Sequence, residues 1–246
     1  MRFLFICICS FFVSLATFAQ STDELIAKNL EAMGGLSKLM STQNITFLGS
    51  VKIRQGNNST DFTFSQVMTK DGKMLFRLVN SLGRIVNLQG FDGVDAWVGT
   101  ESRSQLMKGE ARLDFIHNSF LTRFIDRDRH AKNIKLISSI KQETELSMRD
   151  LLDRRITIVL DNATHQITKE SYLDLQGNFH VIRNSDFKAY DGLVLPSSIR
   201  VTQLPRCKGC SDEEQNNKIV TMSYTVDQVV LNATGIDAKM FEPTGG

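Results

Sequence analysis

The sequence predicts a mainly β fold with helices, built on a large curled antiparallel sheet that forms an incomplete barrel of about eleven strands. Three observations predict it. From Asn44 onward, apolar and polar residues alternate over most of the chain, which is the period of a half-buried strand. Turn-forming pairs such as Asp-Gly separate the runs. Only residues 109–125 interrupt this pattern with a strong helical period.

The first nineteen residues have the pattern of a cleaved secretory signal peptide. Arg2 supplies the positive charge, and residues 3–15 form an apolar run that is too short to span a bilayer. Thr17 and Ala19 place small residues at the −3 and −1 positions of a cleavage site. We therefore expect one domain over residues 20–246, exported to a periplasm or secreted, and soluble. An uncleaved membrane anchor is the alternative.

The charge of the chain excludes some partners. Its 29 Lys and Arg residues nearly balance its 27 Asp and Glu residues, whereas binding to nucleic-acid phosphates requires a basic surface. No segment after the signal peptide is long and apolar enough for a transmembrane helix. We expect a monomer that binds neither nucleic acid nor a cofactor.

The mature chain opens with a predicted helix. Ser21 and Glu24 have the spacing of a capping box, an apolar helical face follows, and Gly34-Gly35 ends it. Residues 36–40 add a short helical turn. We expect this helix pair to cover one end of the sheet.

Eleven strands are predicted after these helices. Five of them form a meander connected by short turns, and six follow the inserted helix. Residues 143–153 are ambiguous between a loop and a helical turn. The predicted strands are 44–54, 62–68, 74–78, 84–91, 94–98, 134–140, 155–160, 165–173, 179–187, 193–204 and 219–231.

The helix predicted at 109–125, between the fifth and sixth strands, carries an apolar stripe rich in Phe. Such a stripe must be buried against a partner, and a sheet of this size curls to give a concave face. The helix is therefore predicted to cover that face. It is either a permanently docked part of the core or a movable lid. The stripe consists of Leu113, Ile116, Phe120, Leu121 and Phe124.

Four segments of the chain resemble one family, and they span nearly the whole mature chain. They are Ala32-Met33-Gly34-Gly35, Gly90-Phe91-Asp92-Gly93-Val94-Asp95-Ala96-Trp97, the run 186–196 from Asp186-Phe187 to Leu195-Pro196, and Ala238-Lys239-Met240-Phe241-Glu242-Pro243. The chain in this respect resembles the LolA/LolB-like superfamily of outer-membrane lipoprotein-sorting proteins. The resemblance implies a periplasmic carrier, not an enzyme, whose cavity accepts acyl chains of lipids or lipoproteins.

The resemblance also implies roles for individual residues. Envelope transport proteins would be further partners. In the carriers of this family, a basic residue near the cavity mouth helps to set the position of the lid, and Arg77 is the nearest candidate for that residue in this chain. The residues expected to line the cavity are Phe62, Phe64, Met68, Phe76 and Leu78. Those expected in the movable lid are Ile116, Phe120, Leu121 and Phe124. Met and Phe also fill ordinary cores, so an envelope interaction protein with a filled core is an alternative.

Cys207 and Cys210 are the only cysteines that remain after signal removal. A pair this close can oxidise in an exported protein. The pair is followed by the polar stretch 211–217, which reads as a loop between two strands, so a disulfide that staples this loop is favoured over an exported thiol oxidoreductase. Zinc binding would need more ligands than this pair supplies.

No other catalytic or metal-binding pattern is present. The four histidines have no metal-ligand spacing, and the chain contains neither a Gly-x-Ser-x-Gly motif nor a Gly-rich phosphate loop. His117 lies beside the apolar stripe and is expected at its polar rim. The sequence thus predicts no catalytic residues and no metal. The histidines are His117, His130, His165 and His180.

Overall fold

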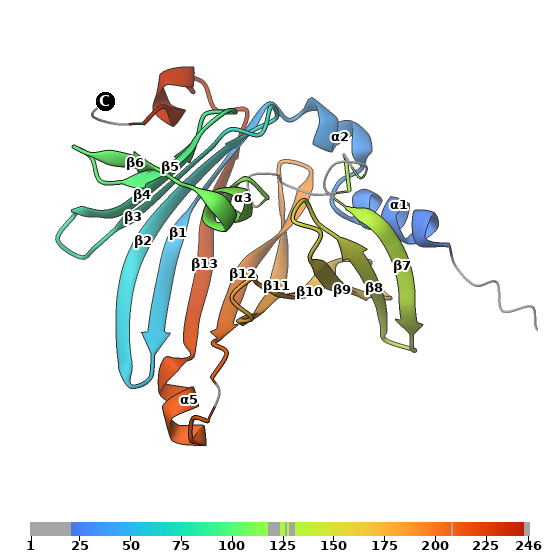
Figure 1. Cartoon of the computed structure of the whole chain (residues 1–246). Helices are drawn as coiled ribbons and strands as arrows, with labels where there is room; N and C mark the ends of the chain where they lie inside the picture. The colour runs from blue at the N-terminus through green and yellow to red at the C-terminus, as the bar shows by residue number, and fades with distance from the viewer. Residues whose placement is uncertain (1–20, 118–123, 126, 128–130, 208, 244–246) are drawn as a thin grey trace, which may run out of the picture.

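The computed structural model describes residues 21–117, 124–125, 127, 131–207 and 209–243. This part of the chain forms one antiparallel sheet of thirteen strands in the order β6-β5-β4-β3-β2-β1-β13-β12-β11-β10-β9-β8-β7. The two ends of the sheet do not pair with each other, so the barrel is incomplete, and helices lie against it (Figure 1). The predicted fold class is confirmed.

The first half of the chain supplies one side of the sheet and two helices that precede it. The helices are α1 (Thr22–Ala32) and α2 (Leu36–Ser41), and the strands are β1 (Asn44–Gln55), β2 (Asn58–Thr69), β3 (Met74–Val79), β4 (Ile85–Phe91), β5 (Ala96–Gly99) and β6 (Ser104–Leu106). Helix α3 (Gly109–His117) follows β6.

The second half supplies the other side. Its strands are β7 (Lys132–Ser139), β8 (Glu143–Arg149), β9 (Arg155–Asp161), β10 (Ile167–Leu173), β11 (Phe179–Tyr190), β12 (Leu193–Leu204) and β13 (Val220–Leu231). Helix α5 (Asp212–Lys218) lies between β12 and β13, and the 3₁₀ helix η1 (Ala238–Phe241) ends the described chain. The pairing of β13 with β1 joins the two halves into one sheet.

The structure differs from the sequence prediction at three places. Two strands were not predicted, β6 and β8; β8 lies in the stretch that read as ambiguous, because alternating charged residues obscure its buried Thr144, Leu146 and Met148. The described helix α3 covers Gly109–His117 of the predicted helix 109–125, residues 118–123 lie outside the described residues, and Phe124 lies in a turn. The stretch predicted as a polar loop contains α5, whose capping box joins Ser211 and Glu214.

A β-bulge contributes to the curl of the sheet. The register between β1 and β13 shifts between Leu48 and Gly49, and a bulge bends the strand that carries it. A Cβ atom at Gly49 would lie 2.0 Å from the carbonyl oxygen of Thr225, so only glycine permits this close approach of the two backbones.

Helix α1 is fixed against the sheet at its C-terminal end. Ser21 caps its first turn by accepting a hydrogen bond from the Glu24 amide, as predicted. After the helix, the Val194 amide donates to the Met33 carbonyl at 3.0 Å. A Cβ atom at Gly34 would lie 2.2 Å from the carbonyl oxygen of Gly192. The glycine pair that ends α1 therefore also lets it meet the β11–β12 turn.

Candidate functional site

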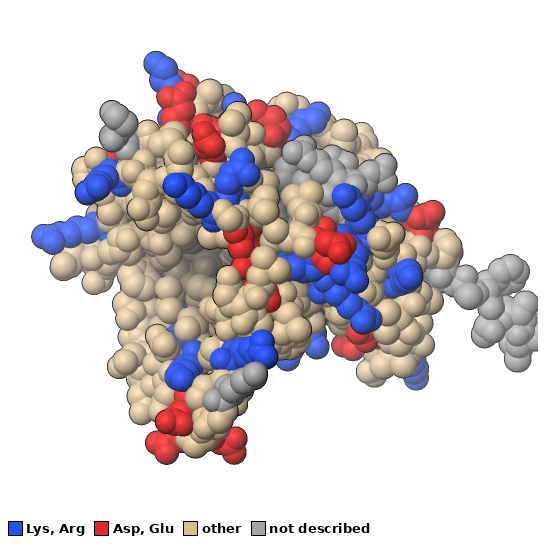
Figure 2. Space-filling view, viewed as in Figure 1, with Lys and Arg blue, Asp and Glu red and all other residues tan. Residues whose placement is uncertain are grey.

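The concave side of the sheet encloses a cavity of about 400 Å³. Its walls come from β1–β3, β9–β13 and α1, and seventeen of its twenty-two lining residues are apolar. Figure 2 shows a hollow below α3 whose visible walls carry no charged side chains. The volume lies within the range of about 300–1,000 Å³ that is usual for small-molecule sites.

The structure brings four of the predicted site residues together on the cavity wall: Phe64, Met68, Phe76 and Phe124. Phe64 and Phe76 lie on paired strands with their ring centroids 6.3 Å apart. Phe124 is buried and also packs against a core cluster that includes Ile26 of α1. An apolar surface from both halves of the chain thus converges on one space.

Two of the other predicted residues lie behind the cavity wall. Phe62 and Leu78 are not among the lining residues, but they pack in the same apolar cluster as Phe64, Phe76 and Val226, which line the cavity. Ile116 of α3 is buried against Phe91 and Ala96 of β4 and β5. Phe120 and Leu121 lie outside the described residues.

Five polar residues also line the cavity, and sequence reasoning did not select any of them as a site residue. Glu170 is the single charged residue among the described lining residues, and no Lys, Arg or His is among them. Burial raises the pKa of Tyr224, which also lines the cavity, so its phenol stays neutral. The polar lining residues are Asn29, Gln66, Gln166, Glu170 and Asn184.

Helix α3 is held over the concave face by Arg154, which precedes β9. The Arg154 Nη2 atom lies 2.6 Å from the Asp114 carboxylate of α3 and 2.7 Å from that of Asp150, and Nη1 lies 3.9 Å from that of Glu110. The guanidinium also stacks over the Tyr172 ring, 4.7 Å from its centroid. The Arg154 side chain is only 4% exposed.

The Arg154 network is ionised and depends on its partners. Burial acts to lower the pKa of Arg154, but the hydrogen bonds and charges of Asp114 and Asp150 outweigh burial and hold that pKa above its ordinary value. Asp150 is fully buried, so its carboxylate needs the guanidinium as a counter-ion. The network therefore ties a helix to the sheet through charges that cannot separate inside the protein without a large cost.

Two further contacts connect α3 to opposite sides of the sheet. Arg112 donates a hydrogen bond to the Val94 carbonyl, at 2.6 Å, in the β4–β5 turn. Glu110 accepts hydrogen bonds from the Leu175 amide, at 2.6 Å, and from the Gln176 side chain, both in the β10–β11 turn. Helix α3 therefore bridges the two halves of the curled sheet across the concave face (Figure 1).

The structure places Arg77, the predicted lid-setting residue, away from this network. Arg77 shares a face of β3 with Leu75, which packs in a cluster with Trp97 and Phe241. The neighbouring Phe76 points to the opposite face, into the cavity. The basic residue that contacts α3 is instead Arg154, which the sequence does not distinguish from its exposed neighbour Arg155.

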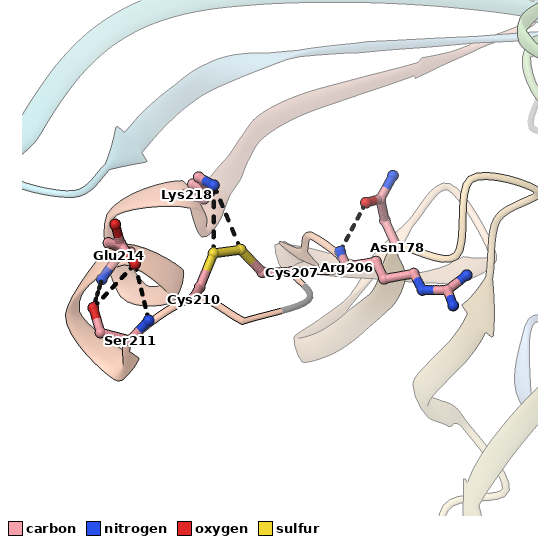
Figure 3. The surroundings of a disulfide bond; sticks show 7 residues. All are labelled: Asn178, Arg206, Cys207, Cys210, Ser211, Glu214 and Lys218. Carbon is pink, nitrogen blue, oxygen red and sulfur yellow. Dashed lines mark hydrogen bonds between the residues drawn. A yellow bond between two sulfur atoms is a disulfide. The ribbon is translucent and has the colours of Figure 1, made fainter.

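Cys207 and Cys210 form a disulfide with a Cα–Cα distance of 5.7 Å. The disulfide lies in the connection between β12 and α5, far from α3, and the Lys218 ammonium lies 3.4 and 3.5 Å from its two sulfur atoms (Figure 3). Cys207 does not begin a helix, and the first turn of the nearby α5 is acidic, which disfavours a thiolate. The Lys218 ammonium acts in the opposite direction, because a neighbouring cation favours a thiolate.

The described residues contain no group of three or more His, Cys, Asp or Glu side chains arranged to hold a metal ion. None of their helices is long and apolar enough to cross a membrane.

Comparisons with known proteins identify the fold. No family model matches the sequence, and no curated protein matches it. A DUF1329 family protein from Desulfovibrio piger is similar in structure, with a TM-score of 0.60 and 13% identity over 89% of this chain and 96% of that chain. A LolA superfamily protein from Nitrosomonas europaea matches with a TM-score of 0.57 and 13% identity, over 89% of this chain and 96% of that one.

A domain named for outer-membrane lipoprotein sorting, from Vibrio parahaemolyticus, is similar to the same degree. Its TM-score is 0.59 with 11% identity, over 88% of this chain and 97% of that chain. The chain therefore has a LolA-like fold, which confirms the fold that the sequence resemblance implied. At these identities the comparison identifies the fold alone.

Proposed function

We propose that this protein is an exported carrier that binds acyl chains of lipids or lipoproteins in its concave cavity. The observation that carries the proposal is the apolar cavity of about 400 Å³ on the concave side of a LolA-like sheet. The names of two of the three structural neighbours refer to the LolA superfamily or to lipoprotein sorting. In this proposal the first nineteen residues are a cleaved signal peptide, the protein acts in the periplasm, and catalysis is not part of its role.

The energetics favour a ligand with a long apolar chain. Burying one CH₂ group contributes roughly 0.8 kcal/mol, so one chain of about ten buried groups gains several kcal/mol after ordering costs. Phe47, Phe64 and Phe76 supply flat apolar surface, while Met33 and Met68 adapt to chains of different shape. A filled-core scaffold would not leave this volume unoccupied, because protein interiors pack with few voids larger than a water molecule.

Helix α3 acts as the lid in this proposal, and Arg154 is its latch. The lid is held mainly through side chains at its first turns, Glu110, Arg112 and Asp114, whose partners belong to turns of the sheet. Ile116 adds an apolar contact to β4 and β5. Opening would exchange these contacts for water, so ligand entry should be faster when the latch is weakened.

The proposal is tested by filling the cavity. Val201 lines the cavity, whereas Thr202 follows it on β12 and does not. We expect Val201→Trp to reduce binding of a fluorescent acyl probe at least tenfold, because the indole occupies the space of the chain. The matched variant Thr202→Trp adds the same bulk outside the cavity and should bind the probe as the wild type does.

Native mass spectrometry of the exported protein purified from its host provides a second measurement. A co-purifying lipid should be present in the wild type and depleted in Val201→Trp. A wild-type protein that is empty and also fails to bind acyl probes would contradict the proposal.

A further inference from the structure

Four of the five polar residues of the cavity form a group on one wall, whereas Gln66 lies on β2 in the other half of the sheet. Glu170 of β10 pairs with Ile182 of β11, and Asn184 lies two residues further along β11 on the same face. Asn184 donates through its side-chain nitrogen to the Ile167 carbonyl at 3.0 Å, and Asn29 of α1 donates to the His165 carbonyl at 2.8 Å. Three separate elements thus bring polar side chains to the start of β10.

The orientation of these amides is fixed by their partners. A backbone carbonyl only accepts hydrogen bonds, so the side-chain amide must turn its nitrogen toward that carbonyl. The oxygen of the same amide group then points away from the carbonyl. The same holds for Gln166, which donates to the Ala32 carbonyl at 2.8 Å. The oxygen of each amide therefore points away from the carbonyl that its nitrogen faces, and the Asn29 oxygen has no hydrogen-bond partner among the described residues.

Asn29 shows that this arrangement has a cost without a ligand. Its side chain is fully buried, and its Oδ1 atom has no hydrogen-bond partner in the described protein. Leaving a buried acceptor unpaired costs about 1–3 kcal/mol, and such atoms are few in native proteins. A leucine at this position of α1 would pack without that penalty. A hydrogen-bond donor on a bound ligand would explain why an asparagine is present instead.

We infer that the wall formed by Asn29, Gln166 and Asn184 selects acyl chains whose linkage donates a hydrogen bond, such as amides and hydroxylated chains. The inference rests on the proposed carrier function and specifies its ligand. Acceptor oxygens pair with N–H and O–H donors, and the buried Asn29 oxygen is such an acceptor.

The test compares two ligands with the same twelve-carbon chain. Dodecanamide offers a donor, and methyl dodecanoate offers none. Each would displace a fluorescent acyl probe from the purified exported protein. We expect dodecanamide to bind about tenfold more tightly than the ester, as one net hydrogen bond implies.

Variants identify the residues responsible. Asn29→Leu removes the buried acceptor at similar volume and should bring the amide and ester affinities within about twofold; Asn184→Leu should do so partly, and it provides the same test if Asn29→Leu does not fold. Glu145→Gln, on the outer face of β8, is the control and should not change the ratio of the amide and ester affinities.

Equal affinities for amide and ester in the wild type, or a preference that persists in both leucine variants, would overturn the inference while leaving the carrier function in place. If neither ligand binds, the proposed function fails and the inference fails with it.

Discussion

The two faces of strands β9–β12 have opposite chemistry although their residues alternate along the same chain. The inner face lines an apolar cavity with a single charge. The outer face lines a groove of about 1,100 Å³ bordered by five cationic and three acidic residues besides the buried Arg154. Figure 2 shows Lys and Arg side chains gathered over this half of the sheet. Charge is thus tolerated where water screens it and nearly excluded where it does not.

The cations of the outer face stand directly opposite one another. Lys169 pairs with Arg183, and Arg183 with Arg200, across three adjacent strands. None of the three forms an ion pair with a carboxylate in the part of the chain that the structure describes. Arg154, by contrast, has carboxylates of three residues around one guanidinium. Of these four cations, only the buried Arg154 therefore depends on its counter-ions.

The largest expected effect comes from replacing the buried cation. Arg154→Met should lower the free energy of unfolding by about 3–5 kcal/mol, because it leaves the buried Asp150 carboxylate without a counter-ion. It should also speed the exchange of a bound acyl probe by loosening α3. Urea denaturation and stopped-flow fluorescence measure the two effects.

The adjacent residue is the control. Arg155 is exposed on the outer face and donates to the Ser147 hydroxyl at 3.0 Å, so Arg155→Met should cost less than about 1 kcal/mol. Equal losses in the two variants would refute the contrast between the faces.

The disulfide belongs to neither face, and its removal should have an intermediate effect. Cys207 and Cys210 enclose a loop of four residues, for which the chain-entropy model gives at most about 2 kcal/mol. The variant with both cysteines replaced by serine should therefore be slightly less stable and bind acyl probes unchanged. Loss of a measurable thiol–disulfide exchange activity together with loss of the cellular function would instead favour the oxidoreductase alternative.

Acid should weaken the β10–β11 turn, in which Asp174 lies. Burial acts to raise the pKa of Asp174, but hydrogen bonds from His180 and Asn178 outweigh it and hold that pKa below its ordinary value of 3.8. A depressed folded pKa gives stability that is present above pH 3.8 and is lost as pH falls through the folded pKa. Asp174→Asn should therefore be less stable at neutral pH and lose less stability on acidification, as thermal melts from pH 6 to about pH 2 would show. An unchanged pH dependence would contradict this role.

The smallest effect should be a gain. Arg183→Gln removes like-charge repulsion with Lys169 and Arg200, so the free energy of unfolding should rise by about 0.5 kcal/mol at low salt, and this gain should shrink as salt screens the charges. Lys188→Gln, on the same strand but paired with Leu195, should give no gain. A loss of stability in Arg183→Gln at low salt would show that the guanidinium has a stabilising contact.

Local pattern determined much of this protein. The alternation of apolar and polar residues placed Phe64, Met68 and Phe76 on one face of the sheet, and the capping residue Ser21 located the start of α1. Both features depend on residues that are close in the chain, so the sequence predicts them. Strand β8 escaped prediction because Glu143, Glu145 and Arg149 are charged, and charged residues such as Glu are uncommon in strands. Its partner strand β9 fixes it, and that partner is not a property of the local sequence.

Only the tertiary structure decided which residues form the lid contacts and the polar wall. Arg154 and Arg155 are neighbouring residues of the same type, so the sequence does not distinguish them. The turn before β9 nevertheless buries Arg154 and exposes Arg155. Asn29 meets His165 across 136 positions of the chain, and Arg154 meets Asp114 across forty. The sequence by itself determined the curled sheet and its apolar face. The packing of distant strands and helices decided where the buried Arg154 network and the unpaired Asn29 oxygen lie.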